Sequence, residues 1–366
     1  MPDQVLQPVD VPSLELYLQS AVPEIQTPIY IKQYTGGQSN PTYQLTAADG
    51  KKFVLRKKPP GMLLSRNLHQ IEREYTIFQA LKESEVPVPK TYCMCVDNTV
   101  IGTPFFIMEH LDGRIFRDST MPNASASERP ELWKAAAEML ACIHRLDLNA
   151  AELQSFVKPG RYYDRQIALF ESLATSYANV VNVETNEYVG ELAHFSEMVD
   201  FFSRRIYQPT DRTVLIHGDF KIDNLVFHMS EPRIIGVLDW EMAALGHPLA
   251  DICNLTHPYF WDRLDQNGRS FQPDQVPGLP SREDCIRWYV GVNGWDPTPD
   301  LPWGDAYFMF RTTVIVQSIT ARYARRQTSK AQEKYVGREA QYAADTWRKL
   351  QQVKERKRQS ARYYKL

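Results

Sequence analysis

The sequence has few of the features that mark a membrane protein or a disulfide-bonded secreted scaffold. Its longest apolar runs, such as Val314–Val316, are far shorter than the roughly 20 residues that cross a bilayer. The start of the chain, Met1–Gln4, lacks the basic and apolar regions of a secretory signal. The cysteines are odd in number and scattered, which disfavours a disulfide framework; they are Cys93, Cys95, Cys142, Cys253 and Cys285. We therefore expect a cytoplasmic protein without a membrane partner.

The chain also lacks a Gly-x-x-x-x-Gly-Lys-[Ser/Thr] motif, which argues against a P-loop enzyme. Its 366 residues are enough for two lobes, each with an apolar interior. The net charge of −2 hides an asymmetry, because residues 322–366 hold 14 Lys or Arg against 4 Asp or Glu, a balance of +10. This balance indicates either a solvated helical face or an electropositive patch that attracts a phosphate-bearing substrate. No nucleic-acid-binding motif accompanies it, so no nucleic-acid partner is expected.

Periodicity divides the chain into a strand-rich part and a helix-rich part. The first part predicts strands at 28–35, 42–46, 52–57, 92–96 and 104–109 and a helix at 67–82. The second part predicts helices at 130–146, 162–176, 188–207, 281–290, 303–326 and 329–359, two short strands at 225–228 and 234–238, and a long loop at 258–280. This order indicates an α+β architecture. We expect a small β-rich N-terminal lobe over 1–109 that binds nucleotide, and a larger helical lobe over 110–366 for catalysis and substrate binding.

One segment carries most of the chemistry, and it runs from His217 through Gly-Asp-Phe-Lys-Ile-Asp to Asn224. Leu-Asp-Trp-Glu follows after the next predicted strand, with its aspartate at position 239. In phosphoryl transfer from ATP, a loop carboxylate such as Asp219 can accept the proton of the attacking hydroxyl. The oxygens of Asn224 and Asp239 can bind Mg²⁺, which takes few protein ligands and leaves room for phosphate and water. Any one of these pairs alone would be read as surface turn residues, but the whole ordered set argues against that.

The same residues resemble a known family. His-Gly-Asp followed by Asn, then Asp-Trp-Glu and Gly-x-Pro-Leu-Ala-Asp, is similar to the aminoglycoside phosphotransferase superfamily, which includes choline kinases. The resemblance implies a two-lobed, protein-kinase-like fold with ATP and Mg²⁺ as cofactors. It implies that Asp219 is the catalytic aspartate, that Lys221 stabilises charge in the transition state, and that Asn224 and Asp239 are the magnesium ligands.

Three further positions enter through the same resemblance. His217 matches a histidine that is mainly structural and holds the loop, so it is not predicted to be the base. Asp251 matches an aspartate that braces the catalytic loop. His247 departs from the family, where Asp is usual in a Gly-Asp-Pro sequence, and its role stays open.

The nucleotide half of the site is predicted in the N-terminal lobe. Gly37, Ser39 and Asn40 belong to a Gly-Gly-Gln-Ser-Asn turn whose backbone amides can approach phosphate, although a plain tight turn explains it as well. The kinase-like phosphate-binding lysine aligns with Arg56, and its ion-pair partner aligns with Glu74. Arginine at this position is a departure, because a planar fork and a point charge grip phosphate differently.

Two details of this half stay open or rest on resemblance alone. Alternation along the strand at 52–57 puts Arg56 on one face with Val54, and Lys57 on the other. Lys57 or Lys58 remains an alternative phosphate ligand. The hinge resembles Met108–Gly113, where the carbonyl of Glu109 and the amide of Leu111 would face adenine.

Longer strings point to one branch of the superfamily. Phe53–Gly61 and the run from Gly218 to Asn224 together look like the kinase-like domain that is fused ahead of an acyl-CoA dehydrogenase in some animal proteins. That branch implies a 4-hydroxyacyl-CoA or similar hydroxy acid as the small-molecule substrate, and a separate acyl-CoA dehydrogenase-like enzyme acting downstream. Arg165, Arg311 and Arg322 are the candidate substrate-binding residues.

Alternatives remain beside this interpretation. A kinase of an amino alcohol or aminoglycoside-like substrate would use aromatic residues, for which Trp295, Trp303 and Tyr307 are candidates, although core packing is the more common explanation. A non-catalytic ATP-binding pseudokinase is suggested only by Arg56. The final Tyr364–Leu366 differs at one position from the peroxisomal Ser-Lys-Leu signal, which leaves a peroxisomal address as an alternative to the cytoplasm.

Overall fold

The structure is a computed structural model that describes residues 8–34, 40–59, 71–149, 151, 153–156, 158, 160–261, 271–328 and 330–363. The chain forms two compact units. The first consists of 1–155, 217–244 and 276–280, and the second of 156–216, 245–275 and 281–366. The boundaries of these two units do not coincide with the predicted lobe boundary at residue 109. The assignment of nucleotide binding to 1–109 and of catalysis to 110–366 stays a prediction.

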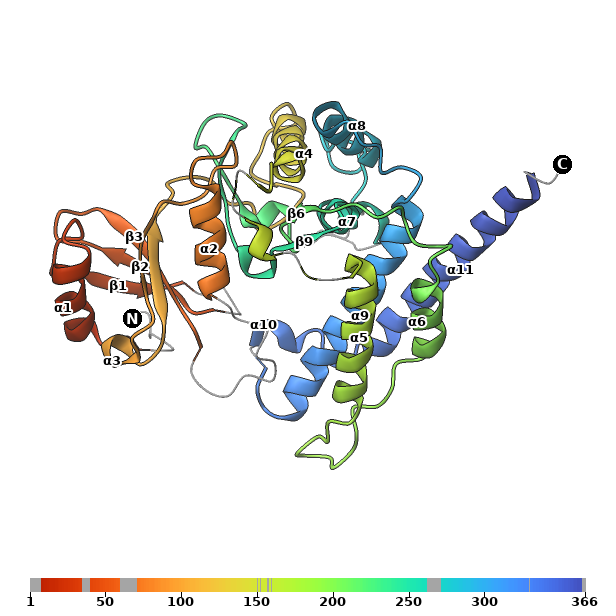
Figure 1. The fold of residues 1–366 in the computed structure, drawn as a ribbon, viewed down its shortest axis with the longest axis horizontal. Helices are drawn as coiled ribbons and strands as arrows, with labels where there is room; N and C mark the ends of the chain where they lie inside the picture. The colour runs from red at the N-terminus through yellow and green to blue at the C-terminus, as the bar shows by residue number, and fades with distance from the viewer. Residues whose placement is uncertain are drawn as a thin grey trace. The chain divides into compact units, whose positions relative to one another are not determined.

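A five-stranded antiparallel sheet forms the strand-rich part of the first unit (Figure 1). Its spatial order is β1-β2-β3-β5-β4, with strands β1 (Tyr30–Gln33), β2 (Thr42–Thr46), β3 (Lys52–Lys57), β4 (Thr91–Cys95) and β5 (Phe105–Glu109). These bounds agree closely with the predicted strands. Helix α1 (Val11–Ala21), which the sequence analysis missed, packs Leu14 and Leu18 into the core of one face, and α3 (Asn98–Ile101) lies beside it.

Helix α2 (Ile71–Leu81) covers the other face of the sheet through Phe78, whose ring lies 6.1 Å from that of Phe106 on β5. The predicted alternation along β3 is confirmed. Arg56 pairs in register with Phe106 and so faces α2. Lys57 lies on the α1 face, where its Nζ sits 5.6 Å from the Tyr43 ring and donates to the carbonyl of Pro8 at 3.3 Å.

The rest of the first unit holds helix α4 (Arg129–Arg145) and a short hairpin of β7 (Leu225–Phe227) and β8 (Ile234–Val237). Two 3₁₀ turns flank this hairpin, η2 (Ile222–Asn224) and η3 (Trp240–Met242). A third turn, η1, spans Leu153–Phe156. The predicted strands at 225–228 and 234–238 are confirmed by the hairpin.

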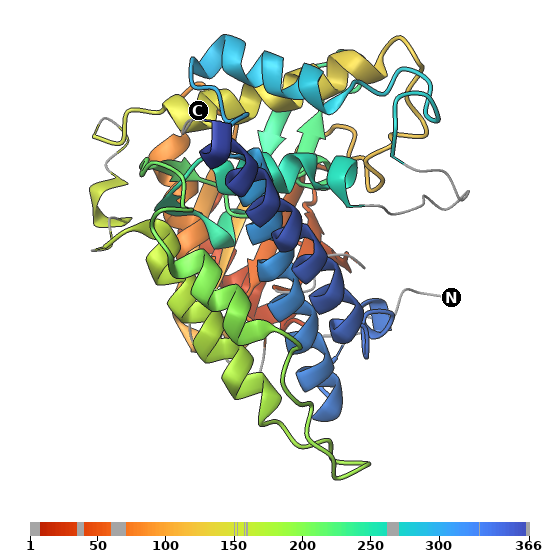
Figure 2. The ribbon, with the colours of Figure 1, turned by 90° about the vertical axis from the view of Figure 1, so that its right-hand side faces the viewer.

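The second unit is mainly helical, and its centre is the pair α9 (Leu301–Ala324) and α11 (Glu339–Tyr363), which run side by side in Figure 1 and Figure 2. Helix α5 (Tyr162–Ala178) packs on α9, and α6 (Phe195–Ser203) packs on both α5 and α11. The remaining elements are α7 (Leu249–Phe260), α8 (Arg282–Asn293), α10 (Lys330–Glu333) and the paired strands β6 (Val214–Ile216) and β9 (Ala244–Gly246). Among helices within the described ranges, none is both long and apolar enough to span a bilayer.

Three predictions in this unit are wrong in part. The helix expected at 188–207 begins only at Phe195, because Gly190 and His194 have positive φ angles of 87° and 58° that an α-helix cannot hold. The helix expected at 329–359 is two helices, separated where Gly337 turns with φ of 74°. Helix α7, which was not predicted, continues to Phe260 despite Pro258, so residues 258–260 are helical and not part of a loop.

Candidate active site

The predicted partners Arg56 and Glu74 form a buried ion pair in the first unit. Arg56 Nη1 donates to Glu74 Oε1 at 2.6 Å, and the two residues are 7% and 0% exposed. The other arm of the guanidinium, Nη2, donates to Asp239 Oδ1 at 3.0 Å and lies 3.9 Å from Glu241 Oε2. Arginine can bridge two carboxylates in this way because its donors form a rigid fork, which a lysine ammonium lacks.

The charges in this cluster are unbalanced, because one guanidinium meets three carboxylates. Burial alone would lower the pKa of Arg56, but Glu74, Asp239 and Glu241 outweigh it, so the pKa is raised and the group stays charged. Burial raises the pKa of Glu74 to about 8, although Arg56 opposes this shift. Burial also acts upward on the pKa of Asp239, but Arg56 holds it below its usual value. The cluster therefore favours a proton on Glu74 and an ionised Asp239.

The loop from His217 to Asn224 is anchored by a buried histidine. The Nδ1 atom of His217 accepts a hydrogen bond from the backbone amide of Asp219 at 3.2 Å, so its Nε2 carries the proton and donates to the carbonyl of Leu238 at 2.8 Å. The imidazole is fully buried against Trp240. Both ring nitrogens are thus used to tie the loop to the end of β8, which supports the predicted structural role.

Asp219 lies among groups that orient and neutralise it. Asn224 Nδ2 donates to the backbone oxygen of Asp219 at 2.8 Å and to its Oδ2 at 3.3 Å. Lys221 Nζ lies 3.3 Å from Asp219 Oδ2 and 3.5 Å from Asp223 Oδ2. Burial would lower the pKa of Lys221, but the two carboxylates raise it above its usual value, so the ammonium is charged at neutral pH. The structure thus brings Asp219, Lys221 and Asn224 together.

The two predicted magnesium ligands sit at the open end of the β7–β8 hairpin. The amide of Leu238 donates to the carbonyl of Asn224 at 2.9 Å, and Asp239 follows in a left-handed conformation with φ of 69°. The side-chain nitrogen of Asn224 donates to Asp219. The side-chain oxygen of Asn224 can therefore serve as the ligand to a cation. Arg56 holds the pKa of Asp239 below its usual value, which favours the ionised form, and the Asp239 side chain is 35% exposed. Two hard oxygen donors of this kind fit Mg²⁺, whose other ligands would be phosphate and water.

Glu241 is a site residue to which the sequence analysis assigned no role. Its Oε2 accepts from Asn40 Nδ2 at 2.7 Å, and its side chain is only 12% exposed. Asn40 is fully buried and closes the predicted nucleotide-binding turn. Glu241 therefore joins the end of that turn to the segment that carries Asp239. Its place in the Asp-Trp-Glu motif was the available signal.

The other predicted nucleotide contacts are only partly described. Gly37 and Ser39 lie outside the described residues. Glu109 ends β5, and its carboxylate accepts from the amide of Lys90 at 3.1 Å. Leu111 packs closely on Gly236. A Cβ added at position 236 would lie only 2.1 Å from the Cδ1 atom of Leu111. The structure thus anchors both hinge residues, and their contact with adenine stays a prediction.

The three arginines predicted to bind substrate belong to the second unit, and they do not gather at one point. Arg165 and Arg311 both act electrostatically on Tyr162, whereas Arg322 acts on Tyr177. Arg311 and Arg322 are eleven residues apart on α9, about 16 Å along its axis.

His247 also lies in the second unit, where it is fully buried. Its Nδ1 accepts from the amide of Leu249 at 3.2 Å, and its Nε2 donates to the carbonyl of Thr210 at 3.0 Å. This histidine therefore supports the start of α7 through both nitrogens.

Comparisons with known proteins give a consistent result. The family model described as "Phosphotransferase enzyme family" matches residues 31–278. Acyl-CoA dehydrogenase family member 11 of Rattus norvegicus is 35% identical over 320 residues, which cover 86% of this chain and 40% of that protein. The chain thus spans about 40% of the length of this curated relative.

Solved structures extend the likeness over most of the chain. A protein of Ralstonia eutropha, provisionally named an aminoglycoside phosphotransferase, is 30% identical with a TM-score of 0.78, covering 94% of this chain and 99% of that one. A thermostable mutant of an aminoglycoside phosphotransferase in a ternary complex with ADP and hygromycin B has a TM-score of 0.57 at 13% identity, covering 92% and 98%. This second likeness concerns the fold alone.

Proposed function

This chain belongs to the phosphotransferase enzyme family, and on that basis we propose that it uses ATP and Mg²⁺ to phosphorylate the hydroxyl of a 4-hydroxyacyl-CoA or a similar hydroxy acid. The chain is a phosphotransferase with an alcohol group as acceptor. The predicted α+β, protein-kinase-like fold is confirmed by the structural likeness. The metal ion and the identity of the acceptor are the proposed parts.

The observation that carries the proposal is the arrangement around Asp219. Its carboxylate takes the proton of the acceptor hydroxyl while the acceptor oxygen forms a bond to the γ-phosphorus of ATP. The bond from that phosphorus to the bridging oxygen breaks, and ADP leaves. Lys221, kept charged by two carboxylates, stabilises the negative charge on the transferring group.

The Arg56 cluster prepares the nucleotide side. A carboxyl group binds a metal ion in its ionised form, and Arg56 favours that form of Asp239 by holding its pKa low. When bound, Mg²⁺ would be held by Asn224 and Asp239 and would neutralise phosphate charge. Arg56 reaches the phosphates from the same position, with Glu74 fixing its guanidinium.

The acceptor is inferred from the relatives and from charge. A relative with 35% identity carries the name of an acyl-CoA dehydrogenase, and the basic balance at 322–366 suits a substrate with several phosphate charges. An amino alcohol kinase would need an accessible aromatic pocket. Trp303 and Tyr307, two of the three aromatic candidates, are 2% and 4% exposed and belong to the core, which disfavours that alternative. A separate acyl-CoA dehydrogenase-like enzyme would then act on the phosphorylated product.

The test is an ADP-release assay that compares a 4-hydroxy acid, its CoA ester and choline at matched concentrations. The CoA ester should give the highest kcat/KM. Equal activity on the free acid would remove CoA from the proposal. Activity on choline alone would contradict the acceptor entirely, and no ADP release with any hydroxyl compound would favour the pseudokinase alternative.

Localisation stays a prediction, because Tyr364–Leu366 lies outside the described residues.

A further inference from the structure

The two carboxylates of the Asp-Trp-Glu motif connect the end of β8 to two distant segments of the first unit. Asp239 accepts a hydrogen bond from Arg56 on β3 at 3.0 Å, across 183 positions of sequence. Glu241 accepts one from Asn40, which stands just before β2, at 2.7 Å and across 201 positions. The short turn that carries both carboxylates needs neither contact for its own conformation. Both contacts therefore serve the arrangement of segments around the predicted nucleotide side.

Asn40 determines where the carboxylate of Glu241 lies. A carboxylate only accepts hydrogen bonds, so the amide nitrogen of Asn40 has to face it. Asn40 is fully buried, and its backbone oxygen accepts from Thr42 Oγ1 at 3.0 Å, which fixes the residue that donates. The distance of 2.7 Å is that of a charge-assisted hydrogen bond. The Glu241 carboxylate is thus held in a defined place, with only 12% of its side chain exposed.

That place is beside the guanidinium of Arg56. The oxygen of Glu241 that accepts from Asn40 is also the one that lies 3.9 Å from Arg56 Nη2. The same Nη2 donates to Asp239, so this arm of Arg56 lies between two carboxylates. The charge of Glu241 is one of three that raise the pKa of Arg56. Because both side chains are largely buried, solvent screens this attraction little.

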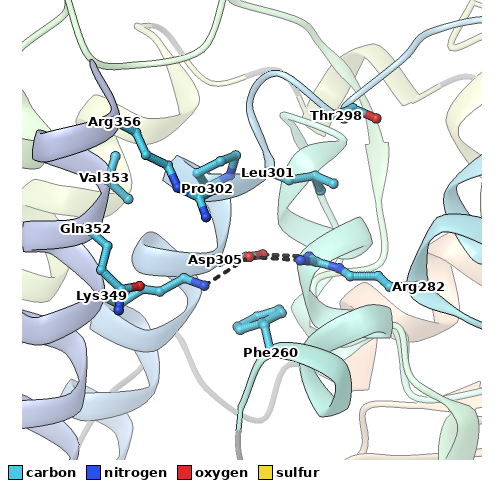
Figure 3. Close-up of a pocket in the computed structure, with 10 residues that line it drawn as sticks. All are labelled: Phe260, Arg282, Thr298, Leu301, Pro302, Asp305, Lys349, Gln352, Val353 and Arg356. Atoms are coloured by element: carbon cyan, nitrogen blue, oxygen red, sulfur yellow. Dashed lines mark hydrogen bonds and ion pairs between the residues drawn. The ribbon is translucent and has the colours of Figure 1, made fainter. Parts of the chain in front are cut away.

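A second buried arginine shows a different arrangement. In the second unit, Arg282 reaches both oxygens of Asp305, Nη2 to Oδ1 at 2.6 Å and Nη1 to Oδ2 at 2.9 Å (Figure 3). One carboxylate is enough to orient that fork. The fork of Arg56 instead has one arm on Glu74 and the other on Asp239. Each carboxylate around Arg56 therefore constrains a different part of its guanidinium.

We propose that Glu241 is a positioning residue for nucleotide binding: its carboxylate, directed by Asn40, holds the guanidinium of Arg56 beside Asp239. This inference rests on the proposed use of ATP, with Arg56 as the predicted phosphate ligand. A guanidinium that is already held in one orientation loses less conformational freedom when phosphate binds. Glu241 acts through Arg56 and needs no contact with the nucleotide, and its side chain is less exposed than that of Asp239, 12% against 35%.

The experiment measures binding of ATP and of adenosine to the intact protein by calorimetry. Glu241→Gln keeps an oxygen that can accept from Asn40 and removes the charge beside Arg56. ATP should bind at least about 5-fold more weakly, and adenosine, which lacks phosphate, should change less than about 2-fold. In an Arg56→Gln background, which keeps a side-chain donor for Glu74, Glu241→Gln should change ATP affinity less than about 2-fold. Glu231→Gln removes an exposed carboxylate of the same unit and should leave ATP affinity within about 2-fold.

Unchanged ATP affinity in Glu241→Gln would overturn the role, and an equal loss for adenosine would show a general disturbance of the fold instead. A loss that persists undiminished in the Arg56→Gln background would show that Glu241 does not act through Arg56. If that background does not fold, the comparison of ATP with adenosine still decides. A loss that disappears when EDTA replaces Mg²⁺ would assign Glu241 to the metal and overturn the positioning role.

The outcome can be separated from that of the proposed function, because binding needs neither an acceptor nor turnover. The expected binding pattern without ADP release would count against the proposed function alone. ATP binding that is indifferent to Glu241 would count against this inference alone. No ATP binding by the unaltered protein would overturn both.

Discussion

At the scale of single residues, the most informative position is Arg56. By resemblance it is predicted to occupy the place of a kinase lysine, and the structure shows how its guanidinium is held: the fork reaches Glu74 on one side and Asp239 on the other. A lysine could not hold both carboxylates with directed hydrogen bonds. The departure from lysine therefore does not by itself indicate a pseudokinase.

Asp219 is the residue whose loss should affect chemistry alone. Asp219→Asn removes the proton acceptor, so kcat should fall by about 100- to 10,000-fold while ATP affinity changes little. Asp223→Asn is the matched control, because Asp223 contacts the same ammonium of Lys221 at 3.5 Å. ADP release and nucleotide titration would measure the two effects. Near-normal turnover of Asp219→Asn would refute the catalytic assignment.

Arg56 should matter for both nucleotide binding and stability. Arg56→Ala leaves the buried, protonated Glu74 without its hydrogen-bond partner, which should cost about 1 to 3 kcal/mol of unfolding free energy and raise KM for ATP. Lys57→Ala is the control, since Lys57 lies on the opposite face of β3, and its KM for ATP should change less than about 2-fold. Equal KM increases in the two variants would contradict the assignment of Arg56 to the phosphates.

Glu74 should make stability depend on pH. Its pKa is raised from about 4.5 to about 8 in the folded protein, so the folded state binds the proton more tightly than the unfolded state does. The resulting stabilisation is present below about pH 4.5 and is lost as pH rises towards 8, by at most about 1.4 kcal/mol per pH unit. Glu74→Gln mimics the protonated form. Urea unfolding at several pH values should show wild type losing stability relative to this variant as pH rises, and a constant difference would count against the shift.

At the scale of elements, the conformation of the proposed catalytic loop, His217–Asn224, depends on a glycine. Gly218 has φ of 85°, and a Cβ there would lie 2.5 Å from the carbonyl oxygen of Met242 in the first unit. The loop and the turn after Asp239 can approach only because position 218 has no side chain. The same close approach fixes the backbone position of the next residue, Asp219.

Gly218→Ala should therefore lower both stability and kcat. Gly50→Ala is a matched control, because Gly50 has nearly the same φ of 84° and nothing within 4 Å of the added Cβ. Backbone strain of about 1 to 3 kcal/mol should appear in both variants, and the clash should add to it only at Gly218. Thermal unfolding and ADP release would measure this. Normal kcat for Gly218→Ala would show that the close approach is not needed for catalysis.

At the scale of the whole molecule, charge is distributed unevenly, with +10 over residues 322–366 and −12 over the rest. Within the described part of that segment, Lys349 of α11 lies 3.5 Å from the buried carboxylate of Asp305. This cation therefore has a defined partner in the helical unit, while attraction of a phosphate-bearing substrate by the segment stays a prediction.

Salt should reveal how far this charge contributes to substrate choice. Raising ionic strength from about 0.05 to 0.5 M shortens the Debye length well below 10 Å and screens partly exposed charges. The ratio of kcat/KM for the CoA ester to kcat/KM for the free hydroxy acid should fall, because kcat/KM for the free acid should change less with salt. A ratio that is independent of salt would argue against charge-based recognition of CoA.

Most strands and the motif residues could be predicted from the sequence, because they depend on interactions between residues that are close together in the chain. The alternation along residues 52–57 predicted which face holds Arg56, and the spacing of Asp219, Asn224 and Asp239 predicted a phosphoryl-transfer site. Helical periodicity alone predicted single helices at 188–207 and 329–359. The glycines within these ranges were a signal that the helices are interrupted. There the positive φ angles at Gly190, His194 and Gly337 decided otherwise.

Only the tertiary structure could show contacts between distant segments. Asn40 meets Glu241 across 201 positions of sequence, and Arg56 meets Asp239 across 183, so neither contact has a local signal. The ion-pair cluster around Asp305 likewise depends on α8, α9 and α11 bringing Arg282 and Lys349 to one carboxylate. Sequence composition predicted that positive charge is concentrated near the C-terminus. How the helices pack decides which of those cations meet a carboxylate, because burial and distance set their electrostatic effect.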